Sequence, residues 1–399
     1  MQMATRFPIE MFSIIAQYAS LEARMHLSVT SRGIYRITIS MLYASIPEMN
    51  IPRTIRCLRT LSAKPEVARL VRSISLDFTI SRVFRSFHSL LSRALTNMAG
   101  LHTLSIQVDF AISRTLIRMS CRLTELVCYV PSEDSHLISE FLSTQPTIQK
   151  LTLLCPSGDL STLHPDALPA LRELSAPTYL LDTLLLPRLP CLSRLCVLGA
   201  SISTKKFVFL VLVFQKAKHL KSLELVIEMD LTTHFMTSQT VSIGLALIGL
   251  VAPYITSLKL DIIRGHIPPY ELQSMFAFCL PWFPDLKTLS VTSPPPNEHT
   301  GGPSQTGPRQ SHAITFHSLH GMLLSMADTP VDFSILFQVP YPITGYIEYF
   351  EPKNPFPNAL YDTSCHTEIL QAWRQVHSGL ETVFFPEFGY EYKDKKCSS

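Results

Sequence analysis

The chain has 399 residues, of which 34 are Lys or Arg and 31 are Asp or Glu, so its formal net charge is +3. Apolar residues make up 46% and charged residues 16%, which excludes a wholly disordered chain and provides enough material for a large core. The weak positive charge argues against nucleic acid as a partner, because nucleic-acid-binding domains usually carry a clustered basic face.

The cysteines and the apolar stretches bear on the compartment. The nine cysteines are scattered and contain no C-x-x-C pair, which predicts free, mostly buried thiols in a reducing environment. The first twelve residues lack the apolar core of a signal peptide, and the apolar stretches 207–214 and 241–255 are shorter than the roughly 18 residues of a membrane span. We therefore expect a cytoplasmic or nuclear protein with no membrane partner.

The chain divides into segments that differ in composition and in apolar periodicity. Residues 1–50 have a helical pattern, residues 51–69 are expected to form a linking helix, and residues 70–292 hold a repeat. Residues 293–310 are dense in Pro, Gly and Ser and predict a disordered or exposed loop. Residues 311–399 return to apolar periodicity and are expected to hold terminal repeats and a cap.

The repeat is a frame of the form apolar-x-x-apolar-x-apolar. Its nine copies begin at Val71, Leu101, Leu123, Ile148, Leu171, Leu192, Leu220, Ile255 and Leu286. Five copies have a proline two residues before the start, and proline both ends a helix and favours extended geometry in the residue before it. Each frame therefore predicts a short strand that follows a helix or an irregular segment.

Stacking such units would bury apolar faces that one unit cannot bury alone, and this favours a solenoid. The predicted fold class is α/β, with a parallel sheet, and the array looks like a leucine-rich-repeat domain of irregular type. The turn position that holds Asn in the usual repeat holds other residues here, so irregular turns are expected. The alternative is an ordinary α/β domain, but most frame starts are too close together for full doubly wound units.

The N-terminus carries a second pattern. Phe7-Pro8-Ile9-Glu10 opens a helix with Ile14, Ile15 and Tyr18 on one face, and a second helix leads to Val29-Thr30-Ser31-Arg32 with Tyr35. Met41-Leu42-Tyr43-Ala44-Ser45-Ile46 closes the segment. In this order the residues resemble the F-box, a unit of three helices, and together with the repeats the chain resembles F-box/leucine-rich-repeat proteins of the fungal, basidiomycete-like type.

This resemblance implies a substrate-recognition subunit of a cullin-based ubiquitin ligase. The F-box would dock on a Skp-family adaptor and through it on a cullin, and the repeats would bind a protein substrate. It implies no catalysis by this chain and no cofactor. The matched adaptor-binding positions are Phe7, Pro8, Ile9, Ile14, Ile15, Tyr18, Leu27 and Val29. The alternative is a repeat scaffold without a ligase role, whose N-terminal helices only cap the array.

Strand alternation predicts a candidate substrate surface. If the first, fourth and sixth frame residues enter the core, the third, fifth and seventh face the opposite side of the sheet. In the middle units the seventh position is apolar, which predicts a stripe across adjacent strands, and such stripes often mark interaction sites. The expected substrate contacts are Tyr129, Leu154, Leu198 and Val226.

Signs of chemistry are weak. The chain lacks the sequence motifs of serine hydrolases, zinc proteases and nucleotide-binding loops. His312, His317 and His320 are poorly spaced for a metal site, and Cys365-His366 near Asp362 lacks an oxyanion-hole signal. One further pattern stays open: Arg53, Arg56 and Arg59 lie on one helical face, either solvated or in contact with an acidic partner.

Overall fold

The structure is a computed structural model, and it describes residues 8–78, 85–108, 110–130, 137–185, 187–199, 204–216, 222–232, 238–295 and 358–392. The chain divides into two compact units, residues 1–196 and 197–399, and the boundary falls within one strand, β7 (Arg194–Leu198). Both units are α/β with a mostly parallel sheet.

The first unit begins with helices and continues as strands alternating with short helices. Its helices are α1 (Ile9–Tyr18), α2 (Leu21–Ser28), α3 (Arg32–Ala44), α4 (Ile51–Ala63), α5 (Pro65–Ala68), α6 (Arg85–Asn97), α7 (Ser113–Ile117), α8 (Ile138–Ser143) and α9 (Leu181–Leu185), with short turns η1 (Ser157–Leu160), η2 (Thr178–Leu180) and η3 (Leu189–Cys191). Its strands before β7 are β1 (Ser45–Ile46), β2 (Ser73–Phe78), β3 (Thr103–Val108), β4 (Glu125–Tyr129), β5 (Lys150–Leu154) and β6 (Glu173–Pro177).

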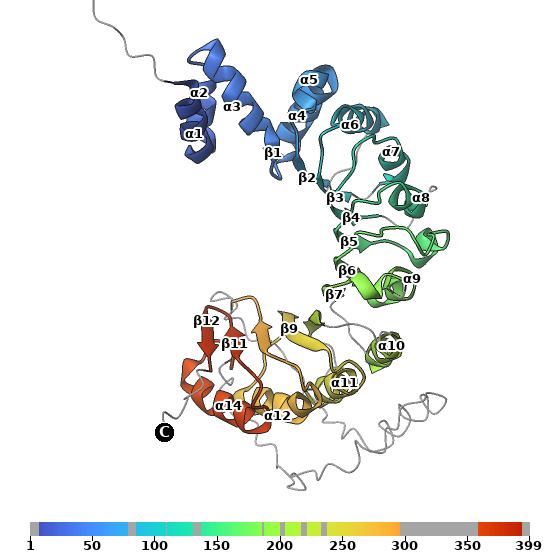
Figure 1. Cartoon of the computed structure of the whole chain (residues 1–399), viewed down its shortest axis with the longest axis vertical. Helices are drawn as coiled ribbons and strands as arrows, with labels where there is room; N and C mark the ends of the chain where they lie inside the picture. The colour runs from blue at the N-terminus through green and yellow to red at the C-terminus, as the bar shows by residue number, and fades with distance from the viewer. Residues whose placement is uncertain are drawn as a thin grey trace, which may run out of the picture. The chain divides into compact units, whose positions relative to one another are not determined.

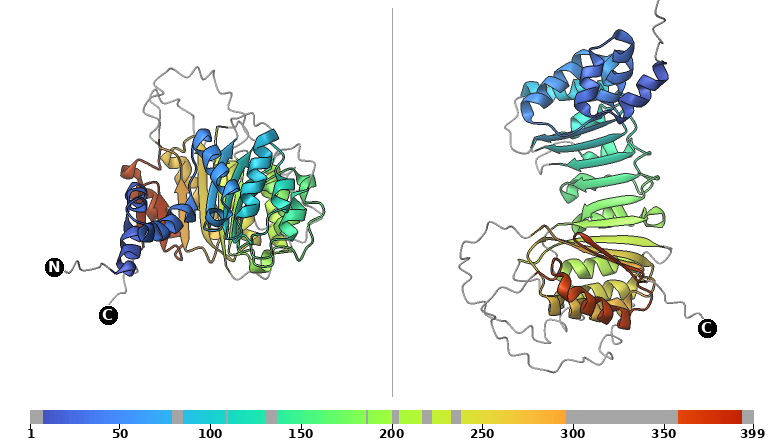
Figure 2. Two further views of the ribbon diagram at one scale, coloured as in Figure 1. Left: turned by 90° about the horizontal axis from the view of Figure 1, so that it is seen from above. Right: turned by 90° about the vertical axis from the view of Figure 1, so that its left-hand side faces the viewer.

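The strands of the first unit lie side by side in sequence order. The pairs from β1 to β6 are parallel, and their register aligns equivalent positions of successive frames. Helices α6 to α9 lie on one side of these strands (Figure 1). The other side, called the open face here, has no helix over it in the described part of the unit (Figure 2).

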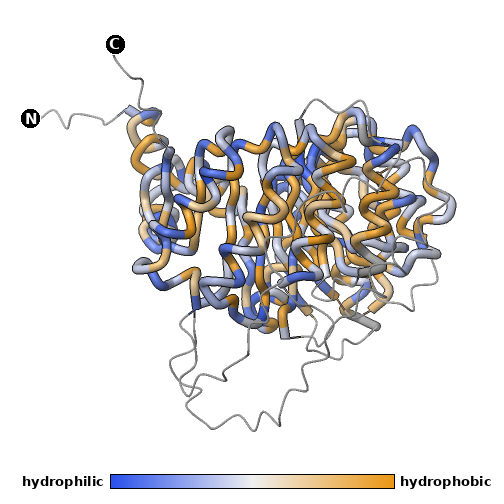
Figure 3. The backbone as a smooth tube through the Cα atoms, turned by 90° about the horizontal axis from the view of Figure 1, so that it is seen from below, coloured by the Kyte–Doolittle hydropathy of each residue, from blue (hydrophilic) through white to orange (hydrophobic). Residues whose placement is uncertain are grey.

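Burial follows the predicted frame. The fourth and sixth frame residues are buried in every copy, and the third and fifth residues that the structure describes are not buried. In β2, for example, Ile74 and Leu76 are buried while Ser73, Ser75 and Asp77 are half-buried. Figure 3 shows the hydrophobic segments concentrated along the strands and helices. The prediction of a strand in each frame is therefore confirmed, and so is the direction of the core.

Backbone hydrogen bonds at the second frame position tie each unit to the next. The carbonyl of Arg72 accepts from the amides of His102 and Thr103, at 2.8 and 3.0 Å. The carbonyl of His102 accepts in the same way from Thr124 and Glu125, and the pattern continues along β5, β6 and β7. Because backbone groups form this ladder, it does not depend on which side chain occupies the position.

Polar side chains tie neighbouring units together at the connections that lead from a helix into the next strand. Asn97 donates to the carbonyls of Leu61 and Ser62, at 3.0 and 3.2 Å. Gln145 accepts from the amide of Leu123 at 2.9 Å and donates to the carbonyl of Cys121 at 3.1 Å. These ties differ from one connection to the next.

The second unit has the same alternation. Its helices are α10 (Thr204–Gln215), α11 (Ser238–Val251), α12 (Pro269–Cys279) and α14 (Thr363–Val376), with the turn η4 (Leu280–Trp282). Its strands after β7 are β8 (Leu223–Asp230), β9 (Ile255–Arg264), β10 (Thr288–Thr292), β11 (Thr382–Phe385) and β12 (Phe388–Glu391). Strands β8 to β11 are parallel in sequence order, and β12 returns antiparallel to β11.

The last helix and hairpin of the second unit pack on the elements before them. Trp373 of α14 is buried, donates to the carbonyl of Gln273 at 3.2 Å and packs edge-on against Phe276. His377 is buried and its Nε2 lies 2.7 Å from the carbonyl oxygen of Phe283. Both contacts join α14 to residues about a hundred positions earlier, so the cap closes directly on the preceding repeat.

The linking segment 51–69 differs from its prediction, and part of the chain that follows β10 is not described. Residues 51–69 form two helices rather than one, because Pro65 begins α5 and cannot continue α4. Most of the expected loop 293–310, the first part of the expected terminal repeats, and His312, His317 and His320 lie outside the described residues. Within the described residues, no helix is both long and apolar enough to cross a membrane.

The cysteines of the described residues are free thiols, as expected. Four of them are buried, but Cys191 is exposed. Burial raises the pKa of Cys121 to about 11 and that of Cys155 to about 12.

Candidate functional site

Helices α1, α2 and α3 carry an apolar surface, called the helical surface here. Ile9, Ile14 and Ile15 are about half exposed, and Tyr18 and Val29 are 85% and 82% exposed. Pro8 is also exposed, Leu27 is half-buried, and Phe7 lies outside the described residues. The matched positions that the structure describes are therefore wholly or partly accessible in the isolated chain.

Three further exposed side chains belong to this surface but were not among the predicted adaptor contacts. Met11, Met25 and Tyr35 are 42%, 58% and 45% exposed. Helical periodicity alone predicts that such residues are buried in a core. The structure shows instead that α1 and α2 bury few of their residues. In α1 the single fully buried residue is Ala16.

Polar contacts, rather than a core, fix the geometry of these helices. Ser20 and Ser31 cap α2 and α3 by accepting from the amides of Ala23 and Ile34, each at 3.2 Å. Arg24 of α2 donates to the last carbonyls of α1, at 2.7 Å to Ala16 and 2.8 Å to Gln17. The helices are thereby held in place while most of their apolar side chains remain available to a partner.

The open face of the first unit carries the second candidate surface. Tyr129 and Leu154 lie directly opposite each other in the register of β4 and β5. Tyr129 is half-buried and Leu154 is 38% exposed. Tyr179, which follows β6, is 51% exposed and was not predicted. Burial is the main cause of the raised pKa of Tyr179, and the Cys155 thiol adds to it. The exposed apolar pair of the open face is Tyr129 with Leu154, which spans two units.

The predicted stripe is interrupted in the second unit. Leu198 is half-buried, but Val226 is only 3% exposed, so its assignment as a substrate contact is wrong. Val226 lies opposite Lys259 in the register and between two glutamates of its own strand, and it is shorter than all three neighbours. As the seventh residue of its frame, Val226 lies on the predicted side of the strand, but the longer side chains around it cover it.

Charged side chains border the open face at the third frame position. Lys150 Nζ lies 2.9 Å from Glu173 Oε1, and Glu125 lies opposite Lys150 in the register. The hydrogen bond to Glu173 is the main cause of the raised pKa of Lys150, and the negative charge of Glu173 adds to it. The positive and negative charges of these residues largely cancel. The apolar group beside them would therefore select a partner by shape and hydrophobicity more than by charge.

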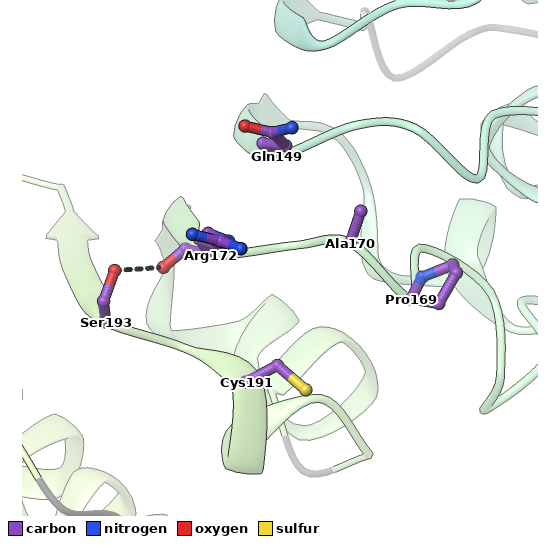
Figure 4. A pocket seen from close by; sticks show the side chains of 6 residues that line it. All are labelled: Gln149, Pro169, Ala170, Arg172, Cys191 and Ser193. Atoms are coloured by element: carbon purple, nitrogen blue, oxygen red, sulfur yellow. Dashed lines mark hydrogen bonds between the residues drawn. The ribbon is translucent and has the colours of Figure 1, made fainter.

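A hollow of about 410 Å³ opens at the amino ends of β5, β6 and β7 (Figure 4). Its lining is Gln149, Pro169, Ala170, Arg172, Cys191 and Ser193. Ser193 donates its hydroxyl hydrogen to the carbonyl of Arg172 at 3.2 Å, within the backbone ladder. Among these described lining residues there is no histidine or carboxylate beside Cys191, so the hollow holds no nucleophile paired with a base.

The Cys365-His366 group is structural. Cys365 Sγ donates to the carbonyl of Asp362 at 3.0 Å, and burial raises the thiol pKa. His366 is 1% exposed, and its ring nitrogens lie 2.8 Å from the Ala359 carbonyl oxygen and 2.7 Å from the Tyr390 hydroxyl. Both nitrogens are therefore used in the cap. In the part of the chain that the structure describes, no cluster of His, Cys, Asp or Glu could hold a metal ion.

Comparison of the chain with protein-family models and with curated proteins gives no match.

Proposed function

We propose that this chain is the substrate-recognition subunit of a cullin-based ubiquitin ligase of the SCF type. Helices α1 to α3 act as an F-box that docks on a Skp-family adaptor and through it on a cullin. The repeats act as an irregular leucine-rich-repeat solenoid that holds a protein substrate on the open face. The chain supplies proximity and orientation while other subunits transfer ubiquitin, in the cytoplasm or the nucleus.

The observation that carries this proposal is the helical surface, whose residues follow the F-box order. An isolated helix such as α1, with one fully buried residue, gains little from its own core. Its exposed isoleucines would each contribute about 1 to 2 kcal/mol if a partner removed them from water. A surface of this kind favours a helix-packing partner over free exposure.

Adaptor binding tests the proposal directly. Ile14→Asp combined with Val29→Asp is expected to lower affinity for a Skp-type adaptor at least about a hundredfold, because interface energy concentrates in a few apolar contacts. Both side chains are exposed, so the variant is expected to keep its circular dichroism spectrum and melting temperature.

The matched control is Ile263→Asp combined with Tyr270→Asp, two apolar side chains of the second unit with exposures of 39% and 44%. The control is expected to bind like the original chain in calorimetry or in a pull-down of adaptor and cullin. Undiminished adaptor binding by the Ile14/Val29 variant would contradict the proposal.

One observation favours the alternative of a scaffold without a ligase role. Strand β1 pairs with β2, and α3 contacts α5, so the N-terminal helices also cover the edge of the sheet. Under this alternative, removal of residues 1–46 would lower the stability of the first unit while no adaptor binds the intact chain. Adaptor binding by the intact chain excludes it.

A further inference from the structure

Helices α4, α6 and α7 share an unusual charge pattern. They carry exposed Arg53, Arg56 and Arg59 on α4, Arg93 on α6, and Arg114 on α7 with Arg118 just after it. Across α4, α5, α6 and α7, the only acidic residue in the sequence is Glu66. This set of six arginines is called the arginine face here.

The arginines lie on the side of their helices that points away from the sheet. In α4 the buried residues are Thr54, Leu58 and Leu61, and the arginines occupy the opposite side at intervals of three. Arg93 lies opposite the buried residues of α6, and Arg114 and Arg118 are four positions apart. Each guanidinium therefore points to solvent on the outer side of the first unit.

The helices place these charges side by side. Helix α4 packs against α6, and α6 packs against α7, in the order seen along the outer side of the strands (Figure 1). Neighbouring helices are about 10 Å apart, and residues 53 to 59 span about 9 Å along α4. The arginine face therefore covers an area of about 20 by 10 Å, which an extended segment of about six residues would cross.

Nothing within the described residues neutralises this face. The structure shows no side-chain hydrogen bond and no ion pair for any of the six guanidinium groups. By contrast, the basic residues Lys150, Lys259 and Lys287 each pair with a carboxylate. Arginine also presents a planar fork of donors that binds carboxylates in a bidentate manner, which lysine cannot do.

The residues near the arginine face and the net charge of the chain indicate which class of partner could bind there. Among the described residues of these helices the one large exposed apolar side chain is Ile51, so they present neither the aromatic platforms on which single-stranded nucleic acid stacks nor the apolar side chains that enter a membrane. The formal net charge of the whole chain is +3, which is low for a protein that binds duplex nucleic acid. A carboxylate-rich protein segment fits both the charge and the size.

We infer that the arginine face is a docking site for an acidic protein segment, rich in Asp and Glu and about six residues or more in length. This site lies on the helical side of the sheet, so it is distinct from the open face and from the helical surface on α1 to α3. The inference goes beyond the ligase proposal and does not depend on it.

The test uses the full chain and a fluorescent peptide of about ten residues, all Asp or Glu, with a Gln and Asn peptide of the same length as the neutral probe. Anisotropy is expected to show binding of the acidic peptide only, with affinity falling as salt rises. Arg53→Glu, Arg56→Glu and Arg59→Glu together are expected to weaken binding at least about tenfold.

The matched control reverses three exposed basic residues elsewhere, as Arg172→Glu, Lys216→Glu and Lys287→Glu, and gives the same net charge. It is expected to bind within about twofold of the original chain, because distant exposed charges are screened. An equal loss in the control would overturn the inference, since bulk charge would then explain the binding.

Two further results would also overturn it. One is absence of acidic-peptide binding at low salt by the original chain. The other is tighter binding of a duplex DNA of about 20 base pairs, with the same dependence on the three arginines, which would assign the face to nucleic acid. Both sets of substitutions are on the surface, so melting curves are expected to match within the small shifts typical of such changes.

Discussion

Arg188 offers the sharpest test of how the irregular turns are held. It is 5% exposed, and its guanidinium donates four hydrogen bonds to backbone carbonyls. The acceptors are Ala167 at 2.7 Å, His164 at 2.9 Å, and Thr183 and Leu184 at 3.0 Å each. One side chain thereby ties the carbonyls of helix α9 to those of the preceding loop.

Replacing Arg188 with Met keeps the length of the side chain and removes all four donors. A hydrogen bond to a charged group contributes about 1.5 to 3 kcal/mol, but the four share one group and are not additive. Burial lowers the pKa of Arg188, which shows that its charge already bears a desolvation cost. We therefore expect a net loss of about 3 kcal/mol, chiefly from carbonyls such as Leu184 that are left without a donor.

Urea unfolding followed by circular dichroism measures the loss, and hydrogen exchange locates it. Because the chain has two units, the exchange rates of the α9 amides give the more direct result. Arg188→Lys is expected to lose less, since an ammonium keeps the charge but cannot reach all four acceptors. Arg172→Met, at an exposed arginine, is the control, with a change of about 0.5 kcal/mol or less. Equal stability of the Arg188→Met and Arg172→Met variants would refute the reasoning.

The remaining predictions concern packing, thiols and the open face. Gly244→Ala is expected to destabilise the second unit by more than about 1 kcal/mol in thermal melts, because the new Cβ would lie 2.4 Å from the Phe207 ring. Iodoacetamide near pH 8.5 is expected to label Cys191 well before Cys155, by mass spectrometry. Stability is expected to fall above about pH 8.5 in urea titrations, because raised folded-state pKa values mean that the unfolded chain loses its thiol protons first. Tyr129→Asp with Leu154→Asp is expected to abolish substrate capture while adaptor binding persists.

The periodic part of the fold was predictable from the sequence because each frame has the same physical requirement. A strand residue such as Ile74 or Leu76 must enter the core whatever follows it, so the frame predicts both the strand and its buried side. The short strands and their parallel order within each unit follow from that requirement.

The turns and the surface were less predictable because they depend on single contacts between distant residues. Nothing near Arg188 in the sequence indicates that His164 and Ala167 will be its acceptors. Val226 was wrongly predicted to be exposed. Strand alternation predicts on which side of a sheet a residue lies, but it does not predict whether longer neighbouring side chains cover that residue. Tyr179 was missed for a related reason, since it follows the strand instead of lying in it.

The two sides of the first sheet can be separated by experiment, and this bears on whether they serve one partner. The arginine face lies on the helical side, and the pair Tyr129 and Leu154 lies on the open face, with the buried layer between them. Substitutions more than about 10 Å apart that share no partner usually have additive free-energy effects. If one substrate wraps around the sheet, reversing Arg53, Arg56 and Arg59 in a Tyr129→Asp chain would therefore add its full loss to substrate binding. If the faces serve different partners, the reversal would leave substrate binding unchanged and affect only the acidic segment.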